Sequence, residues 1–486
     1  MDGDERPDMI TSERMAAVDR NAAALGVPRK QLMESSGNAV AREVRDIADT
    51  GASVAVVAGR GNNGGDAFVA ARFLDDYDVT VHLLGRPESI ATDISRENWA
   101  ALQQAEYDTR IVKDSRSLDL GDPDVVVDGI LGTGVSGAPR QPESSAIEAV
   151  NDAGATVVAV DVPSGMDADS GETSGAAIDA DRVVTFHDQK PALADREDVT
   201  VADIGIPDAA DLFVGPGDLQ RLERDPQAHK GEFGRVLVVG GGPYTGAPAL
   251  SAQATLRAGA DLAFLAVPDN VADSVRGYSE NLIVDSLVGN RLVPEHVPEL
   301  LDRAEDVDVV VLGPGLGDAD DTLAAVMAFL EKFDGTAVVD ADALQVVPEV
   351  DTDATLVCTP HQGELQGMGG PSAESWEERA EAVESFAAEL GHTLLVKGAY
   401  DVVSDGDTTR VNRTGNPGMT VGGTGDVLAG ATAAMCSTLD PVPAASVGAY
   451  ANGTAGDLVV DEQGYGLLAT DLIDALPRAL WGDGDE

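Results

Sequence analysis

The segment from Gly415 to Asp426 combines a glycine-rich run with one carboxylate, directly before an apolar helical pattern that starts at Val427. Backbone N–H groups at the N-terminus of such a helix can hold phosphate charge as it develops. Asp426 lies in the first turn and could act there as a general base. It could instead cap the helix, which stabilises a helix by about 1 kcal/mol. The long glycine-rich approach favours the catalytic interpretation.

Other polar segments that follow predicted strands should converge on this place. Lys397 is one of only six lysines, which favours a phosphate contact. Asp340 and Asp342 end another strand, and either could be structural. The sequence has no GxxxxGK[ST] motif, so we do not expect a P-loop enzyme. Further segments of this kind are Gly313–Gly317, Thr359–Glu364 and Lys397–Ala399.

A second glycine-rich segment follows the predicted strand 53–58. Gly59, Gly61 and Gly64 satisfy the GxGxxG fingerprint between a strand and a helix, where glycines let the backbone approach a diphosphate. The acidic residue that usually binds a ribose is missing after the next strand. A plain glycine-rich turn is the alternative interpretation.

Two more predicted strands in this half end in carboxylates, Asp128 and Asp161. For either one alone, helix capping is the better explanation. Their joint occurrence at the carboxyl ends of parallel strands predicts a ligand crevice. Asn63, Asp128 and Ser164 offer hard oxygens, which suit an alkali or alkaline-earth cation. His187 and Lys190 end this half, and a lone histidine is more often structural.

The elements that must position these residues are short β-branched runs alternating with Ala-rich helical patterns. This alternation predicts an α/β fold of two domains, each built around a mainly parallel sheet. We expect a boundary at about 218–228, with domains at 1–218 and 225–486. The predicted strands are 53–58, 79–84, 124–127, 156–160 and 182–186, then 235–239, 262–267, 308–312, 336–339, 355–358 and 393–396.

The charge balance is extreme, with 85 acidic against 32 basic residues and a net charge of −53. Such a chain repels itself in dilute buffer, whereas molar salt shortens the Debye length to ~3 Å. We therefore expect a cytoplasmic protein of a salt-accumulating halophile that binds neither nucleic acid nor membrane. The acidic N-terminus does not resemble a signal peptide, and the two cysteines imply no disulfide framework.

Together these motifs resemble the bifunctional NAD(P)H-hydrate repair enzymes over about 10–215 and 225–480. The resemblance implies a Rossmann-like NAD(P)HX epimerase domain followed by a ribokinase-like, ADP-dependent NAD(P)HX dehydratase domain. It implies K⁺ in the first domain and Mg²⁺ with ADP in the second. We also expect a homo-oligomer. Ala67 and Gln362 depart from the usual family residues, but neither removes a functional group.

The resemblance also assigns roles to individual residues. Asp161 and Asp426 would be catalytic, and Asn63, Asp128 and Ser164 would hold the potassium ion. The substrate would contact Asn62, Asn63, Gly64, Gly65, Asp66, Gly132, Thr133, Gly134, Val135, Ser136, Gly137, Ala138 and Asp161 in the first domain. In the second domain it would contact Ala247, Gly315, His361 and Asp426, and the adenine nucleotide would contact Lys397, Gly398, Ala399, Tyr400, Asp401 and Gly425.

The expected chemistry begins with a hydroxyl next to the nicotinamide ring nitrogen. Its expulsion gives a planar iminium that water re-enters from either face, with Asp161 moving the proton. In the second domain ADP would phosphorylate the hydroxyl, and loss of phosphate would restore NADH or NADPH and release AMP.

Two alternatives remain open at this point. One is a ribokinase-like small-molecule kinase with a regulatory nucleotide-binding first domain. The other is a module without enzymatic activity that senses a nucleotide or docks a partner.

Overall fold

The computed structural model describes residues 9–114, 118–134, 137–222, 224 and 227–482. The chain divides into two compact units, Met1–Ala210 and Asp211–Glu486, called here the first and second units. The predicted boundary at 218–228 lies beyond this division. Residues just after 210 pack within the second unit: Val214 N donates to Val411 O at 2.9 Å, and Arg410 pairs with Asp218 at 3.1 Å.

The first unit is a doubly wound α/β unit. Its described residues form a seven-stranded parallel sheet in the order β3-β2-β1-β4-β5-β6-β7. The strands are β1 (Ser53–Ala58), β2 (Asp78–Leu84), β3 (Asp108–Val112), β4 (Val125–Gly129), β5 (Thr156–Val160), β6 (Arg182–Phe186) and β7 (Val199–Ala202). The helices are α1 (Ser12–Ala24), α2 (Arg29–Ile47), α3 (Asn62–Phe73), α4 (Asp93–Gln104), α5 (Glu143–Asn151) and α6 (Asp208–Leu212), which crosses the division, with 3-10 helices η1 (Pro87–Ser89) and η3 (Pro191–Leu193).

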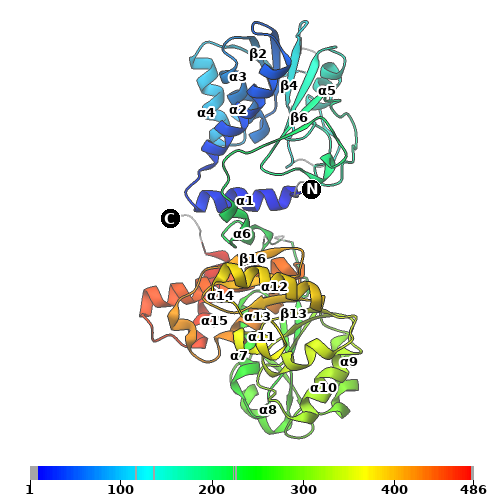
Figure 1. The fold of residues 1–486 in the computed structure, drawn as a ribbon, viewed down its shortest axis with the longest axis vertical. Coiled ribbons are helices and arrows are strands. Elements are labelled where there is room, and N and C mark those ends of the chain that lie inside the picture. Colours follow the sequence, from blue (N-terminus) through cyan, green and yellow to red (C-terminus); the bar gives the residue numbers. More distant parts are fainter. Residues whose placement is uncertain (1–8, 115–117, 135–136, 223, 225–226, 483–486) are drawn as a thin grey trace. The chain divides into compact units, whose positions relative to one another are not determined.

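The central strands of this sheet are uninterrupted apolar runs because both faces are buried. Helices α2 to α4 pack on one face and α5 packs on the other (Figure 1). The strand order reverses between β1 and β4, which is where ligands bind in open α/β sheets. The polar segments after β1, β4 and β5 therefore meet at this crevice.

The second unit holds a nine-stranded sheet in the order β10-β9-β8-β11-β12-β13-β14-β15-β16, parallel except for the two pairs that involve β15. The strands are β8 (Arg235–Val239), β9 (Leu262–Pro268), β10 (Ile283–Leu287), β11 (Val309–Leu312), β12 (Thr336–Val339), β13 (Thr355–Cys358), β14 (Thr393–Val396), β15 (Asp401–Ser404) and β16 (Thr409–Asn412). The helices are α7 (Gly246–Arg257), α8 (Asp269–Arg276), α9 (Val297–Ala304), α10 (Asp320–Leu330), α11 (Gln362–Gly367), α12 (Trp376–Leu390), α13 (Thr424–Cys436), α14 (Pro441–Gln463) and α15 (Ala469–Trp481). The 3-10 helices are η4 (Asp218–Leu222), η5 (Pro294–His296), η6 (Ala341–Glu349) and η7 (Pro417–Thr420).

Helix α13 packs very closely against α7, and this contact fixes where Asp426 lies. A Cβ on Gly430 would lie 2.0 Å from Ser251 O, so only glycine fits there. Thr255 Oγ1 donates to Gly430 O at 3.0 Å, and Ser251 Oγ donates to Asp426 O at 2.8 Å. Helices α7, α13, α14 and α15 cover one face of the sheet, and α9, α10 and α12 cover the other (Figure 1).

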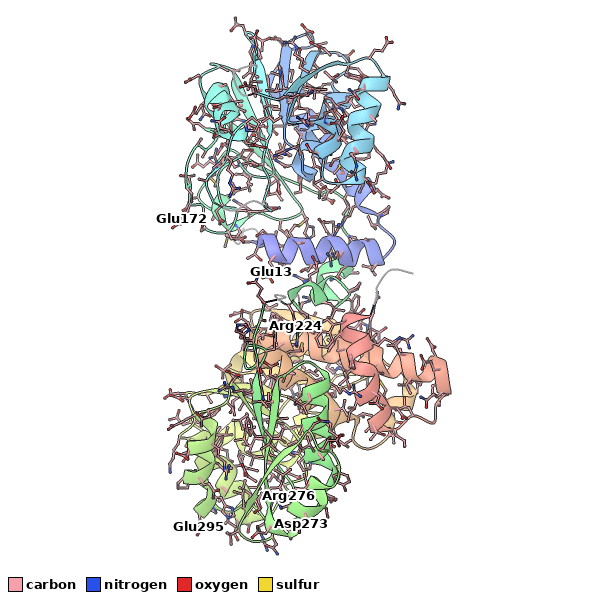
Figure 2. The ribbon with its side chains drawn as sticks, turned by 180° about the vertical axis from the view of Figure 1, so that it is seen from behind. Glu13, Glu172, Arg224, Asp273, Arg276 and Glu295 are labelled. Atoms are coloured by element: carbon pink, nitrogen blue, oxygen red, sulfur yellow. The ribbon has the colours of Figure 1, made fainter. Side chains whose placement is uncertain are left out.

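Some of the few basic side chains at the surface form ion pairs. Arg276 and Asp273, which Figure 2 shows side by side on α8, are paired at 3.0 Å with the carboxylate almost fully exposed. With 85 acids and 32 bases, most carboxylates have no cation to pair with. Within the described ranges, no helix combines the length and the apolar character needed to span a membrane.

Candidate active sites

The first site begins where β1 runs into α3. A Cβ on Gly59 would lie 1.9 Å from Ile130 O, and one on Gly64 would lie 2.3 Å from Gly59 O. Glycine is therefore required at these positions, because the turn packs tightly against the backbone that follows β4 and against itself. Asn63 to Asp66 are buried in the first turn of α3. Asn62 is turned away toward α4, where its Oδ1 accepts a hydrogen bond from Thr92 Oγ1 at 2.8 Å.

The three predicted cation ligands lie in one hydrogen-bonded cluster around the backbone of Leu131. Asn63 Nδ2 donates to Leu131 O at 2.7 Å, and Leu131 N donates to Ser164 Oγ at 2.8 Å. Ser164 Oγ donates to Asp128 Oδ1 at 2.6 Å, and its N–H donates to Asp128 Oδ2 at 2.9 Å. Burial raises the pKa of Asp128 to about 6, although hydrogen bonds from Ser164 and Ile130 oppose this.

The loop after β4 closes over this cluster. A Cβ on Gly132 would lie 3.0 Å from Asn63 Cβ, so the loop packs directly on α3. A cleft between the loops is lined by Gly132 and Gly137 on one side and by Pro163 and Gly165 on the other. Thr133, Gly134 and Ala138 belong to the same loop, whereas Val135 and Ser136 lie outside the described residues.

Asp161 follows β5 with a left-handed backbone, at φ +65°. Such a conformation is strained for a residue other than glycine and is found mostly at functional sites. Its Oδ1 accepts a hydrogen bond from Thr185 Oγ1 at 3.1 Å and forms an ion pair with Lys190 Nζ at 3.0 Å. Burial, then the charges of Asp161 and Asp19, raise the pKa of Asp66 well above its usual range.

The second site lies at the N-terminus of α13. Gly423 caps the helix with φ +98°, and Thr424 Oγ1 donates to Met419 O at 2.9 Å. This turn leaves the Asp426 side chain partly buried with no capping hydrogen bond among the described residues. Burial raises the pKa of Asp426 to about 7, with a further rise from Asp340 and an opposing effect of Lys397. Asp426 is thus poised between its acid and base forms near neutral pH.

Lys397 is paired with two carboxylates that come from other strand ends. Its Nζ lies 3.0 Å from Asp340 Oδ1 and 3.6 Å from Glu364 Oε2. Thr359 Oγ1 donates to the same Asp340 oxygen at 2.8 Å. Burial lowers the pKa of Lys397, but these carboxylates outweigh it and raise the pKa overall. A Cβ on Gly425 would lie 3.5 Å from Lys397 Nζ, so the ammonium reaches the glycine-rich turn.

His361 caps the short helix α11 and is exposed. Its Nδ1 accepts hydrogen bonds from Gly363 N and Glu364 N, both at 3.0 Å. Its Nε2 lies 3.5 Å from Glu364 Oε1. Because Nδ1 is occupied, Nε2 is the ring atom left to contact a substrate.

The predicted nucleotide segment 397–401 forms a tight turn between β14 and β15. Gly398 N donates to Asp401 Oδ1 at 2.9 Å, and burial raises the pKa of Asp401 to about 6. Tyr400 stacks on Trp376 with ring centres 5.3 Å apart. Gly398 and Ala399 are exposed at the tip of the turn.

Ala247 and Gly315 meet at the strand-order reversal of the second sheet, between β8 and β11. A Cβ on Gly315, which has φ +72°, would lie 3.2 Å from Ala247 Cβ. The two positions predicted to contact the substrate from different loops are therefore neighbours.

Both units match known families. Residues 236–478 match the NAD(P)H-hydrate dehydratase family, and residues 29–192 match the family of the YjeF-related protein N-terminus. The bifunctional NAD(P)H-hydrate repair enzyme Nnr of Methanothermobacter thermautotrophicus is 42% identical over 489 residues, which cover 96% of this chain and 94% of that protein. The chain belongs to the family of bifunctional NAD(P)H-hydrate repair enzymes. The member from Pyrobaculum aerophilum is 43% identical, with 97% of this chain and 98% of that protein covered.

Among solved structures, the ADP/ATP-dependent NAD(P)H-hydrate dehydratase of Bacillus subtilis, co-crystallised with ATP/Mg²⁺, is 28% identical. It covers 55% of this chain and 97% of its own, with a TM-score of 0.48. Family membership confirms the resemblance found in the sequence. The predicted fold class of two α/β domains, the first with a doubly wound parallel sheet, is also confirmed.

Four charged residues at the two sites were not assigned a role from the sequence. Asp340 and Glu364 pair with Lys397, and Lys190 pairs with Asp161. Asp19 on α1 is close enough to Asp161 for the charge of Asp161 to help raise its pKa, which burial lifts to about 6. The scarcity of lysine was the available signal for Lys190, as it was for Lys397.

Proposed function

We propose that this chain repairs hydrated NADH and NADPH at two sites. The first unit would interconvert the R and S epimers of NAD(P)HX, and the second would dehydrate the S epimer with ADP, releasing AMP and phosphate. The observation that carries the proposal is Asp426, a carboxylate with a pKa of about 7 beside Lys397 at a glycine-rich helix N-terminus. The full-length relatives, which span both units, weigh against the kinase alternative.

In the first unit, Asp161 would move the proton during epimerisation. Loss of the hydroxyl leaves a planar iminium, and water adds back to either face. Asp161 suits this role because its carboxylate is held by Lys190 and Thr185 at the crevice where ligands bind. Asn63 to Asp66 and the loop 132–138 would bind the nicotinamide nucleotide.

The cluster of Asn63, Asp128 and Ser164 fits a potassium ion. The Ser164 hydroxyl, the Asp128 carboxylate and the Leu131 carbonyl lie together there, and their oxygens suit a hard cation. Asn63 contacts the Leu131 carbonyl through its amide nitrogen, so its amide oxygen would be the further ligand. No group of three or more His, Cys, Asp or Glu residues able to hold a metal occurs in the described ranges, so softer metals are not favoured. A bound cation would supply positive charge that offsets the buried Asp128 carboxylate and orders the loop above it.

In the second unit, Asp426 would deprotonate the substrate hydroxyl as it attacks the terminal phosphoryl group of ADP. The N–H groups of residues 422–425 and the Lys397 ammonium would hold the charge on the transferring group. The phosphorylated intermediate then loses phosphate, because the nitrogen lone pair expels a good leaving group. Mg²⁺ bound with the nucleotide would neutralise phosphate charge.

The remaining contacts follow from the positions that meet in the structure. Ala247, Gly315 and His361 Nε2 would contact the NAD(P)HX substrate. The turn 397–401 and Gly425 would contact the adenine nucleotide. Because the dehydratase would accept one epimer only, an epimerase in the same chain allows both to be recovered.

We further propose that the enzyme works in the cytoplasm at high salt and as a homo-oligomer. The net charge of −53 supports the salt requirement, because the unpaired carboxylates repel one another unless salt screens them.

The test is recovery of the reduced-nicotinamide absorbance in concentrated KCl. Purified protein is mixed with both NADHX epimers, Mg²⁺ and ADP, with ATP in a parallel run. Recovery from both epimers, with one AMP for each NADH, is expected. Recovery from one epimer only would refute the epimerase assignment. No recovery, from protein shown to be folded at that salt, would refute the repair function and favour the kinase alternative.

A further inference from the structure

Lys190 is a fully buried lysine beside Asp161, the residue proposed to move the proton in epimerisation. Its ammonium donates to Phe186 O at 2.8 Å and to Asp188 O at 3.3 Å, and it lies 3.0 Å from Asp161 Oδ1. Its side chain is 0% exposed. Two hydrogen bonds and one ion pair surround the ammonium. A buried charge is costly unless it is paired, so the contact with Asp161 is the electrostatic partner that this buried ammonium requires.

Asp161 is fixed through only one of its two oxygens. Oδ1 accepts from Thr185 and pairs with Lys190, whereas no hydrogen-bond or ion-pair partner of Oδ2 is found in the part of the chain that the structure describes. The strained backbone, at φ +65°, turns the residue out of the line of β5. The second oxygen of this oriented carboxyl group therefore remains available for a proton.

Asp66 has the opposite environment. It is more than nine-tenths buried, and no cation or hydrogen-bond donor faces its carboxyl group among the described residues. Burial and the charges of Asp161 and Asp19 raise its pKa well above the usual range. The Asp161 carboxylate thus has a cation and a hydroxyl donor beside it, whereas Asp66 has neither among the described residues, and such a difference in environment is how paired acids divide acid and base roles.

We infer, resting on the proposed epimerase function, that Asp66 is the proton donor and Asp161 the proton acceptor, with Lys190 and Thr185 as positioning residues for Asp161. Asp66 gives its proton to the departing hydroxyl, the C–O bond breaks, and the nitrogen lone pair forms the C=N⁺ bond as water leaves. Water then attacks the other face of the iminium and loses a proton to Asp161. Transfer of one proton from Asp161 back to Asp66 restores the resting enzyme.

Other charged groups also face this pair and must be included in its pH dependence. Asp19 on α1 is influenced by Arg29 on α2, by Asp161 and by the loop residues Lys190 and His187. Apart from Lys190 itself, these groups are unchanged in the variants below, and Thr185→Val leaves all of them in place, so a shift shared by both variants reports the contact to Asp161.

The experiment measures kcat/KM for interconversion of the two epimers against pH in wild type, Lys190→Met and Thr185→Val. Removing the ammonium disfavours the ionised carboxylate, so the acid limb of the Lys190→Met profile should move up by about one to three pH units. Thr185→Val keeps the shape of this fully buried side chain but removes the hydroxyl that donates to Asp161. It should therefore also move the acid limb to higher pH, by a smaller amount. Lys30→Met is the matched control, because Lys30 forms an exposed pair with Glu97 at 2.5 Å, and its profile should be unchanged.

Asp66→Asn tests the donor. It should lower the epimerisation rate by about a hundredfold or more across the pH range, which is the usual contribution of a general acid. The positioning role would be refuted if the rates of Lys190→Met and Thr185→Val fell by the same factor at every pH while the acid limb of each profile stayed at its wild-type pH. An active Asp66→Asn enzyme would refute the donor role. Wild-type protein that does not interconvert the epimers would refute the proposed function itself, so the two failures are distinguishable.

Discussion

The strongest test of the second site is the substitution Asp340→Asn. Burial and the Asp340 charge raise the pKa of Asp426 to about 7, while Lys397 lowers it. Asp340 also holds Lys397 at 3.0 Å. Without the Asp340 charge, the Asp426 carboxylate loses one repulsion, and the Lys397 ammonium is free to approach it. Both effects favour ionised Asp426, so the acid limb of the pH profile of the dehydration rate should move to lower pH.

The size of the effect follows from the fraction of Asp426 that is ionised. With a pKa of about 7, roughly one-tenth is ionised at pH 6. A fall of about one unit, a typical effect of a nearby charge, raises that fraction at pH 6 to roughly one half. The rate at pH 6, relative to the plateau of the same variant, should therefore rise about fivefold. The plateau itself should fall, because a base with a lower pKa is weaker.

The assay follows NADH recovery from S-NADHX with ADP from pH 5 to 9 at fixed salt. Each variant is normalised to its own plateau, so a general loss of activity does not affect the result. Asp342→Asn is the matched control, since Asp342 lies in the same loop and its charge is not among those that shift Asp426. An acid limb that stays near pH 7 or moves upward in Asp340→Asn would refute the reasoning. An equal shift in Asp342→Asn would also refute it.

Four further predictions address the two sites and the fold. Asp426→Asn should abolish dehydration but leave epimerisation intact, and loss of both activities in a folded variant would contradict the two-site proposal. The pKa of Asp426 in the folded state, about 7, exceeds the usual value of 3.8, so its buried charge destabilises the fold above pH 7. The Asn variant lacks this charge. Asp426→Asn should therefore raise the melting temperature at pH 8 and not at pH 4. Gly59→Ala places a Cβ 1.9 Å from Ile130 O and should destabilise the first unit by about 1–3 kcal/mol in denaturant unfolding, whereas Gly61→Ala, with open space around it, should cost under about 1 kcal/mol. Replacing KCl with tetramethylammonium chloride at equal ionic strength should slow epimerisation and spare dehydration, and equal losses of both would argue against a potassium site in the first unit alone.

The central strands and the glycine-rich turns could be predicted from sequence because their signals are local. Strands such as β1 and β4 are buried on both faces and read as continuous apolar runs. The strands β3, β7, β10, β15 and β16 were missed. The first three are largely exposed at or near the sheet edges, so their sequences lack that apolar signal. The strands β15 and β16 are buried but only four residues long, and polar residues limit their apolar runs.

The sequence by itself determined the two α/β units, the family and the segments that carry the chemistry, because each motif directly follows one buried strand. Only the tertiary structure decided which charges meet. Lys397, Asp340 and Glu364 follow β14, β12 and β13, and their contact depends on the order of those strands in the sheet. Lys190 reaches Asp161 because the chain folds back after β6. Its ammonium group is thereby buried beside the carboxylate of a residue whose backbone is strained. The pKa values that set acid and base roles follow from this burial and pairing, which no spacing of residues along the chain can specify.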